Sequence, residues 1–196
     1  MQDTQRNEEF IRIIQERLSE RRCFHSRCVA QAARMLAKQY GADAGRAYTA
    51  GILHDIMKEA PREEQLQTIA AAGIILTDVE RVNPKLWHAV SGYAYCRDRL
   101  HVTDGGILRA IRYHTTGRAG MTLLEKCVYI ADFISDDRDY PGVEELRACA
   151  RRGLEEVMRE GLKFTLSELA RNGQAIHPDS VAAYNQIIIS DSEGNE

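Results

Sequence analysis

The segment AYTAGILHDIMK, residues 47–58, places an adjacent histidine and aspartate, His54 and Asp55, inside an apolar run. A solvated polar pair is not expected in such a run, because burying a charged group without a partner is costly. The pair therefore requires a partner in the core. Residues of the same two types recur along the chain at His25, His88, His114 and Asp132. A metal ion is the partner that would satisfy all of these residues together.

The overall composition is that of an ordinary soluble globular protein. The chain has 196 residues, of which 44% are hydrophobic and 28% are charged, with a formal net charge of -3. This charge argues against a dedicated nucleic-acid binder, which would be strongly basic. Apolar runs are much shorter than the roughly 20 residues that span a bilayer. The first residues, MQDTQRNEEF, are polar and acidic, unlike a targeting peptide. We therefore expect a cytoplasmic protein that binds neither a membrane nor a long nucleic acid.

Apolar residues recur at helical spacing along nearly the whole chain, and almost no segment alternates at period two. The helix that Asp43 caps is expected to contain His54 and Asp55. The other signals that begin or end helices are Gly41, Pro61, Asn83-Pro84, Asp104, Thr122 with Glu125, Tyr140-Pro141-Gly142, Asn172-Gly173 and Asp179. We predict an all-α fold, a single compact helical bundle over residues 1–190 with the metal site between core helices. A disordered tail is expected over residues 191–196.

Helical geometry directs several of these polar residues toward the core. A helix places residues i, i+3, i+4 and i+7 on one face, and both His25 and Asp132 share their faces with apolar neighbours. One histidine on an apolar face is more often a hydrogen-bonded core residue than a metal ligand. Several such residues without obvious partners are improbable in a marginally stable protein, so we predict a shared metal site. His101, beside a charge cluster, and His177, in a loop, are expected to lie outside it.

The order His25, His54-Asp55, His88, His114, Asp132 resembles the signature of the HD-domain superfamily of metal-dependent phosphohydrolases. Four segments look like the YqeK-type members of this superfamily: HDIMK (54–58), NPKLWHA (83–89), AIRYHTTGRAGMTLLEKCVYIADFI (110–134) and YPGVEELR (140–147). That family hydrolyses diadenosine tetraphosphate symmetrically into two ADP molecules. The resemblance covers about residues 22–190. It therefore implies an HD fold and a symmetrical diadenosine tetraphosphate hydrolase.

This chain departs from the family pattern at three places. The family often has Gly where this chain has Cys28, and Pro where it has Val90. It usually reads Ile-Glu-Pro-x-Arg where residues 134–138 read Ile-Ser-Asp-Asp-Arg. The arginine, Arg138, is retained, so the phosphate contact that the resemblance implies is kept.

The resemblance also implies a ligand set. The primary ion would be held by His25, His54, Asp55 and Asp132. Two alternatives stay open for His88 and His114: they hold a second ion with Asp55 bridging, or they contact the phosphate directly beside a single ion. Imidazole and carboxylate ligands suit a divalent or trivalent ion such as iron, manganese, zinc, cobalt or magnesium, and iron is favoured. None of the five cysteines belongs to a Cys-x-x-Cys pair, so a thiolate zinc site is not expected.

Cationic residues near the expected ligands are candidates for binding phosphate. Lys58 lies one turn after Asp55, and Arg138 follows the helix of Asp132, so both can reach the same pocket. Asp55, Lys58, His88 and His114 are the expected catalytic residues. A solvated position stays open for Lys58, and an ion pair with Asp136 or Asp139 stays open for Arg138.

The residues after His114 are a further candidate substrate contact. Thr115 and Thr116 precede Gly117, where a glycine turn can bring the backbone close to a ligand. Arg118 could add charge at the entrance to the site, with a solvated surface position as the alternative.

A local cationic pocket in a weakly acidic protein suits a small polyanion, so we expect a dinucleotide or nucleoside diphosphate partner; a homodimer stays open. Other functions also stay open. One is a different nucleotide phosphohydrolase or phosphodiesterase of the same superfamily. Another is a metal-dependent oxygenase, although Lys58 and Arg138 argue against it because oxygen activation needs no phosphate contacts. The last is a non-catalytic nucleotide-binding module, which has little reason to retain a ligand set that activates water.

Overall fold

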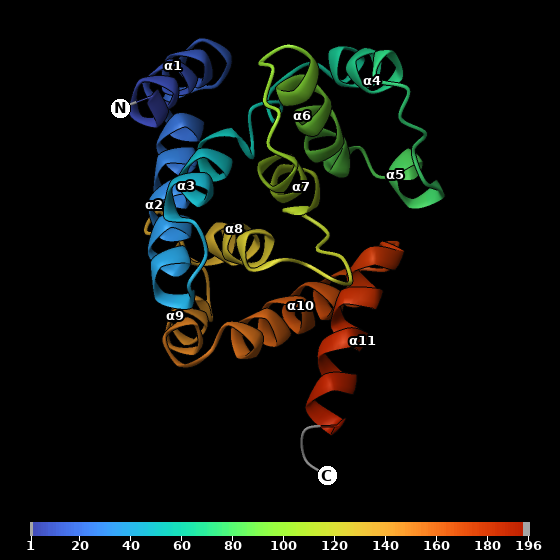
Figure 1. Cartoon of the computed structure of the whole chain (residues 1–196). Helices are drawn as coiled ribbons and strands as arrows, with labels where there is room; N and C mark the ends of the chain where they lie inside the picture. Colours follow the sequence, from blue (N-terminus) through green and yellow to red (C-terminus); the bar gives the residue numbers. More distant parts are fainter. Residues whose placement is uncertain (1, 194–196) are drawn as a thin grey trace.

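Residues 2–193, which the computed structural model describes, fold into eleven α-helices and one 3₁₀ helix with no β-strand among them (Figure 1). In chain order these are α1 (Gln2–Arg17), α2 (Glu20–Tyr40), α3 (Ala44–Leu53), α4 (Arg62–Ala71), α5 (Asp78–Val82), η1 (Pro84–Leu86), α6 (Trp87–Asp98), α7 (Gly105–Tyr113), α8 (Leu123–Ile134), α9 (Val143–Arg152), α10 (Leu154–Arg171) and α11 (Pro178–Glu193). The predicted all-α fold is therefore confirmed.

Helix α8 is the central element of the bundle. It packs against α2, α3, α7, α9 and α10. The run Cys127–Ala131 on this helix is fully buried. A helix that is covered on nearly every side must be apolar nearly all round, which explains the sequence LLEKCVYIADFI. Asp132, at the C-terminal end of this apolar helix, is thereby fixed next to the core.

Helices α2 and α3 pack closely against each other. A Cβ atom on Gly51 would lie 2.5 Å from Cα of Ala30, a distance that real Cβ atoms essentially never show. Only glycine therefore allows the two backbones to approach this far. The contact fixes α3, whose C-terminal end carries His54, against α2, which carries His25.

Several helix boundaries agree with the signals in the sequence. Gly41 ends α2 with φ 80°, the left-handed conformation that favours glycine. The side chains of Asp43 and Asp104 accept hydrogen bonds from backbone N–H groups in the first turns of α3 and α7. Thr122 and Glu125 form the predicted capping box of α8.

The expected helix around His54 and Asp55 is shorter than predicted. Helix α3 ends at Leu53, His54 is its C-cap residue, and residues 54–59 form successive turns. The turns are tightened by bonds from Ile56 N to the Leu53 carbonyl at 3.1 Å and from Lys58 N to the Asp55 carbonyl at 2.8 Å. An apolar run of this length is compatible with either a helix or a buried turn. As a result, Asp55 lies in the turns beyond the end of α3.

The C-terminal boundary also differs from the sequence expectation. Helix α11 begins at Pro178, so Asp179 lies in its first turn and is not its cap. The helix continues to Glu193, although the tail was expected to begin at residue 191. An ion pair at 2.6 Å between Arg159 and Asp191 holds this last turn against α10. Residues 194–196 of the expected tail lie outside the described residues.

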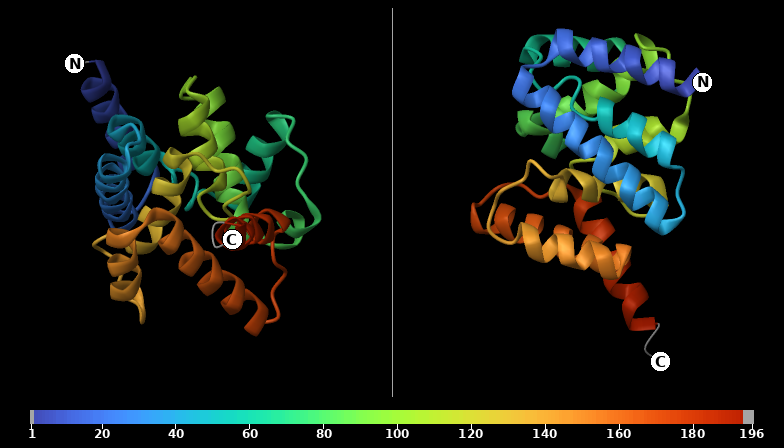
Figure 2. Two further views of the ribbon diagram at one scale, coloured as in Figure 1. Left: turned by 60° about the horizontal axis from the view of Figure 1, so that its bottom comes forward. Right: turned by 90° about the vertical axis from the view of Figure 1, so that its left-hand side faces the viewer.

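Helices α1 and α11 lie at opposite ends of the molecule, with the site-bearing helices between them (Figures 1 and 2). One short helix was not predicted: α5 begins at Asp78, and its N-cap residue Thr77 forms a capping box with Glu80. Within residues 2–193, no helix combines the length and the apolar character needed to cross a membrane.

Candidate metal centre

The six predicted residues come together between α2, α6, α8 and the turns that follow α3 and α7. We call them the His/Asp cluster: His25, His54, Asp55, His88, His114 and Asp132. Their potential ligand atoms form three overlapping groups, and within each group all atoms lie within 4.8 Å of one another. All but Asp132 are buried. Segments that are more than one hundred residues apart in the sequence thus place imidazole and carboxylate groups around one point.

Three of the histidines are oriented in the same way. Nδ1 of His54, His88 and His114 lies 2.7, 2.8 and 2.8 Å, respectively, from the backbone carbonyl three residues earlier. A carbonyl only accepts, so Nδ1 of each ring must carry the proton. Nε2, which then has a free lone pair, is directed into the cluster. This is how proteins fix the tautomer of a metal-binding histidine.

His25 is oriented by a carboxylate and not by a carbonyl. Its Nδ1 lies 2.7 Å from Oδ2 of Asp137, and its Nε2 lies 3.0 Å from Oδ1 of Asp132. Ser135, which is fully buried, donates a hydrogen bond of 2.7 Å to the other oxygen of Asp137. Burial alone would lower the pKa of His25, but the hydrogen bonds to Asp132 and Asp137 raise it above its ordinary value.

Asp55 lies at the centre of the cluster. Its Oδ1 is 3.2 Å from Nε2 of His88 and 3.5 Å from Nε2 of His114. Its Oδ2 accepts a hydrogen bond of 2.9 Å from Arg22 and lies 3.5 Å from Nε2 of His54. Burial would raise the pKa of Asp55, but the surrounding histidines hold it well below its ordinary value. Asp55 is therefore a carboxylate that faces histidines on both sides.

Two buried atoms in the cluster test whether a metal ion fits. His54 Nε2 and Asp55 Oδ1 have almost no exposed surface and no hydrogen-bond partner in the protein. A buried polar atom without a partner is costly. Burial also lowers the pKa of His54 to about 4, so its imidazole is neutral near pH 7 and its lone pair can bind a cation. The nitrogen and oxygen donors of the cluster therefore fit a metal ion.

Lys58 and Arg138, the predicted phosphate contacts, both point toward the cluster. Lys58 Nζ lies 3.1 Å from His88 Nε2 and 3.9 Å from Asp55 Oδ1. Arg138 forms an ion pair with Asp132, and its Nη2 lies 3.5 Å from His25 Nε2. About a third of each cationic side chain stays exposed, 34% for Lys58 and 35% for Arg138. Each can thus contact both the cluster and a ligand that arrives from solvent.

The residues after His114 differ in whether their polar groups have partners within the protein. The hydroxyl of Thr116 donates to the Gly117 carbonyl, and the Thr116 carbonyl accepts from Ser180 at 2.7 Å. Gly117 has φ 63° and lies against side chains of α8 and α11. These two residues therefore contribute to packing beneath α11. The hydroxyl of Thr115 is buried without a hydrogen-bond partner among the described residues.

Arg118 and the other two histidines lie outside the cluster. The guanidinium of Arg118 pairs with both carboxylate oxygens of Glu125, at 2.8 and 2.9 Å, and is thereby held at the start of α8. His101 is exposed, and His177 is buried 3.4 Å from the Thr77 hydroxyl. Neither histidine belongs to the three ligand groups, as expected.

Two residues of the site were not identified from the sequence, Arg22 and Asp137. Arg22 precedes His25 by three residues and thus shares its helix face, a spacing that could have revealed it. Asp137 lies in the loop between α8 and α9 and reaches His25 only because that loop folds over α2. No local signal distinguishes it from its neighbour Asp136.

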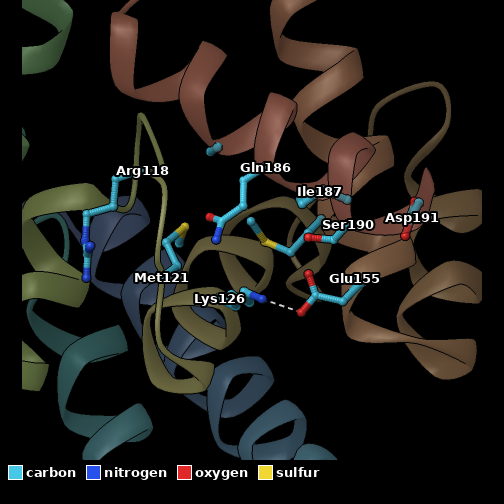
Figure 3. Close-up of a pocket in the computed structure, with 10 residues that line it drawn as sticks. Arg118, Met121, Lys126, Glu155, Gln186, Ile187, Ser190 and Asp191 are labelled. Carbon is cyan, nitrogen blue, oxygen red and sulfur yellow. Dashed lines mark hydrogen bonds and ion pairs between the residues drawn. The ribbon is translucent and has the colours of Figure 1, made fainter. Parts of the chain in front are cut away.

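Two cavities lie near these elements. One of about 480 Å³ opens beside Asp132 and Arg138. Another of about 200 Å³ lies between α8, α10 and α11, where Lys126 of α8 forms an ion pair with Glu155 of α10 (Figure 3). Only the first cavity includes a residue of the His/Asp cluster in its wall.

Comparisons with known proteins identify relatives over almost the whole chain. The model of the HD domain matches residues 22–136. The chain is 39% identical to the symmetrical bis(5'-nucleosyl)-tetraphosphatase of Bacillus subtilis, over 92% of this chain and 97% of that protein. It is 36% identical to the protein of the same name from Halalkalibacterium halodurans, over 91% and 95%. A crystal structure of a predicted HD superfamily hydrolase involved in NAD metabolism, from Clostridium acetobutylicum, superposes with a TM-score of 0.90 at 32% identity, covering 94% of this chain and 97% of that chain.

Proposed function

The chain belongs to the HD domain family, and on that basis we propose that it is a metal-dependent hydrolase that cleaves diadenosine tetraphosphate symmetrically into two ADP molecules. The match over residues 22–136 includes every member of the His/Asp cluster. The relatives named as symmetrical tetraphosphatases cover more than nine tenths of this chain. The substrate and the symmetry of cleavage are taken from those names.

One observation in the site carries the proposal. Three cationic side chains, Arg22, Lys58 and Arg138, each contact a carboxylate of the His/Asp cluster. A cluster that served only to hold a metal would not need three cations beside it. A polyphosphate needs them, because phosphoryl transfer depends mainly on positioning and on neutralising the charge of the phosphate oxygens.

The residues present would hold a metal ion as follows. His25, His54, Asp55 and Asp132 are proposed to bind a primary ion, while His88 and His114 bind a second ion or the phosphate. A bound ion would supply a Lewis acid that acidifies water and withdraws charge from phosphorus. Asp137 and the three backbone carbonyls would keep the four imidazoles oriented for binding such an ion.

The cationic residues are proposed to act on the substrate. Lys58 Nζ lies 3.1 Å from His88 Nε2, which would hold its ammonium group at the mouth of the cluster. Arg138 can present two parallel N–H groups to a phosphate, a geometry that suits its planar guanidinium. Together they would hold the polyphosphate over the cluster and offset the charge that develops on the departing ADP.

The identity of the ion and the location of the protein are finer proposals. Iron is the proposed ion, supported by the imidazole and carboxylate donors and by the lack of any cysteine in the ligand groups of the described residues. Manganese, zinc, cobalt and magnesium are the alternatives that elemental analysis would distinguish. A cytoplasmic location is supported by the five free cysteines, since reducing compartments keep thiols unpaired.

Product analysis tests the proposed activity. Protein purified without chelator is incubated with diadenosine tetraphosphate, and the nucleotides are separated by chromatography. ADP should be the only nucleotide product, and a control with Asp132→Ala should lose bound metal and turnover together. Equal amounts of AMP and ATP would mean asymmetric attack and would contradict the assignment.

A further inference from the structure

The cavity of about 480 Å³ beside the His/Asp cluster has two chemically different ends. Asp132 and Arg138 form the end next to the cluster. The rest is what we call the aromatic pocket: Phe133, Tyr140, Pro141 and Phe164, with Glu168 also in its wall. We infer that the aromatic pocket binds the nucleobase of a nucleotide whose phosphate lies at Arg138. This inference rests on the proposed function and adds to it a binding site for one half of the substrate.

The rings of the pocket are arranged to accept a flat ligand. Tyr140 and Phe164 have ring centroids 5.9 Å apart and planes inclined by only 30°. The hydroxyl of Tyr140 donates to the Phe133 carbonyl at 2.9 Å, which fixes the ring of Tyr140 across the loop. The side chain of Phe164 is 43% exposed, so its face can be reached from solvent. A single exposed phenylalanine is unremarkable, but here it completes a concave wall with two neighbouring rings.

The size and lining of the cavity agree with a nucleoside. Pockets for small ligands commonly measure about 300–1,000 Å³ and are lined mainly by apolar and aromatic side chains with a few polar groups. Stacking on aromatic rings is how proteins hold bases without reading their edges, because every base has a π-face. The aromatic pocket provides such faces from α8, from the loop before α9 and from α10.

Continuity with the cluster identifies the ligand as a nucleotide. Arg138 lines the cavity, and its Nε donates to the Asp132 carbonyl at 2.6 Å, which directs the guanidinium along the boundary between the two ends. A ligand that fills both ends must be anionic at one end and flat and apolar at the other. Inorganic polyphosphate would use the first end only.

A neighbouring cavity also contains Tyr140 and Phe164, together with Arg152, but its wall includes no residue of the His/Asp cluster. The cavity in Figure 3 is lined by no aromatic ring, and its Lys126 is paired with Glu155. A separate pocket near the start of α2 contains one phenylalanine, Phe24, which is 61% exposed. Because Phe24 is exposed and lines a separate pocket, it provides a matched control for Phe164.

The test measures binding, not turnover. Isothermal titration calorimetry of the full-length, metal-loaded protein is carried out with ADP and with inorganic pyrophosphate, for wild type, Phe164→Leu, Phe164→Tyr and Phe24→Leu. Leucine keeps the apolar bulk but removes the ring, so Phe164→Leu should weaken ADP binding about 10-fold. Phe164→Tyr keeps the ring and should bind ADP like wild type. Neither change should alter pyrophosphate affinity, metal content or the helical circular dichroism spectrum.

Several outcomes would overturn the inference: unchanged ADP affinity in Phe164→Leu, an equal loss of pyrophosphate affinity, or the same ADP loss in Phe24→Leu. A wild-type protein that binds no ADP would overturn it as well. Failure of the proposed function would look different. In that case wild type would produce no ADP from diadenosine tetraphosphate, yet would still bind ADP in a manner that depends on Phe164.

Discussion

The contact between Asp137 and His25 gives the sharpest prediction about metal binding. Asp137 Oδ2 lies 2.7 Å from His25 Nδ1, and the Asp137 side chain is only 17% exposed. If this carboxylate turns the imidazole toward the metal, removing it should weaken metal binding without removing any ligand. The perturbation is made in two steps, Asp137→Asn and Asp137→Ala.

The size of each effect follows from the groups that are removed. Loss of the partner that orients a metal-binding histidine typically costs about 10- to 100-fold in metal affinity. Asparagine retains an oxygen that can accept from Nδ1 and loses only the charge, so we expect a roughly 10-fold loss, about 1.4 kcal/mol. Alanine also leaves the buried Ser135 hydroxyl without its acceptor, so a loss nearer 100-fold is expected.

The assay is competition for Co²⁺ or Mn²⁺ with a chromophoric chelator, with the melting temperature measured in parallel. Asp136→Asn is the matched control, because Asp136 is the exposed neighbour in the same loop. It should bind metal like wild type. Wild-type affinity in folded Asp137→Ala would refute the reasoning, since His25 would then be oriented without its carboxylate.

Three further changes test the helix packing, a buried ion pair and the phosphate contacts. Gly51→Ala should lower the free energy of unfolding by about 1–3 kcal/mol, because the added methyl group meets the backbone of α2. Burial would raise the pKa of Glu80, but hydrogen bonds from the Thr77 N–H and from Arg112 hold it below its ordinary value. The stabilisation by Glu80 should therefore be fully present above about pH 4.5 and be lost as the pH falls through the lowered pKa. In urea unfolding, Glu80→Gln should lower the free energy of unfolding by about 1.5–3 kcal/mol at pH 7 and by less in acid. Lys58→Met should lower kcat/KM about 10- to 100-fold with unchanged metal content.

Each of these changes has a control or an outcome that contradicts it. Gly161→Ala on α10 places its methyl group in ordinary contact with Ile130, at 3.5 Å, and should not destabilise the protein. A pH-independent cost in Glu80→Gln would mean that its charge contributes nothing to stability. Lys85→Met, an exposed lysine near the same site, should keep wild-type kinetics. Wild-type kinetics in Lys58→Met would place that ammonium group outside the phosphate pocket.

The helices and the His/Asp cluster could be predicted because their signals are local. Capping residues such as Asp43 and Thr122 act on backbone groups within three residues. Polar residues on apolar faces, such as His25 and Asp132, point inward wherever their helices pack. The six cluster residues could therefore be identified together before their contacts were known.

What could not be predicted depends on how distant segments dock. Asp137 becomes the partner of His25 across 112 positions of sequence, and Arg22 reaches Asp55 across 33. The end of α3 at Leu53 was also missed, because the same apolar pattern fits a helix or a buried turn. The aromatic pocket joins α8, α10 and the loop before α9, and none of these segments indicates a cavity by itself.

Anomalous X-ray diffraction from crystals of protein purified without chelator would test the central claim most directly. The position of any bound ion is located from its own scattering, and data across absorption edges identify the element. We predict a peak among the ligand atoms of His25, His54, Asp55 and Asp132, with any second peak beside His88 and His114. An active protein whose only ion lies elsewhere, or whose cluster holds none, would contradict this prediction.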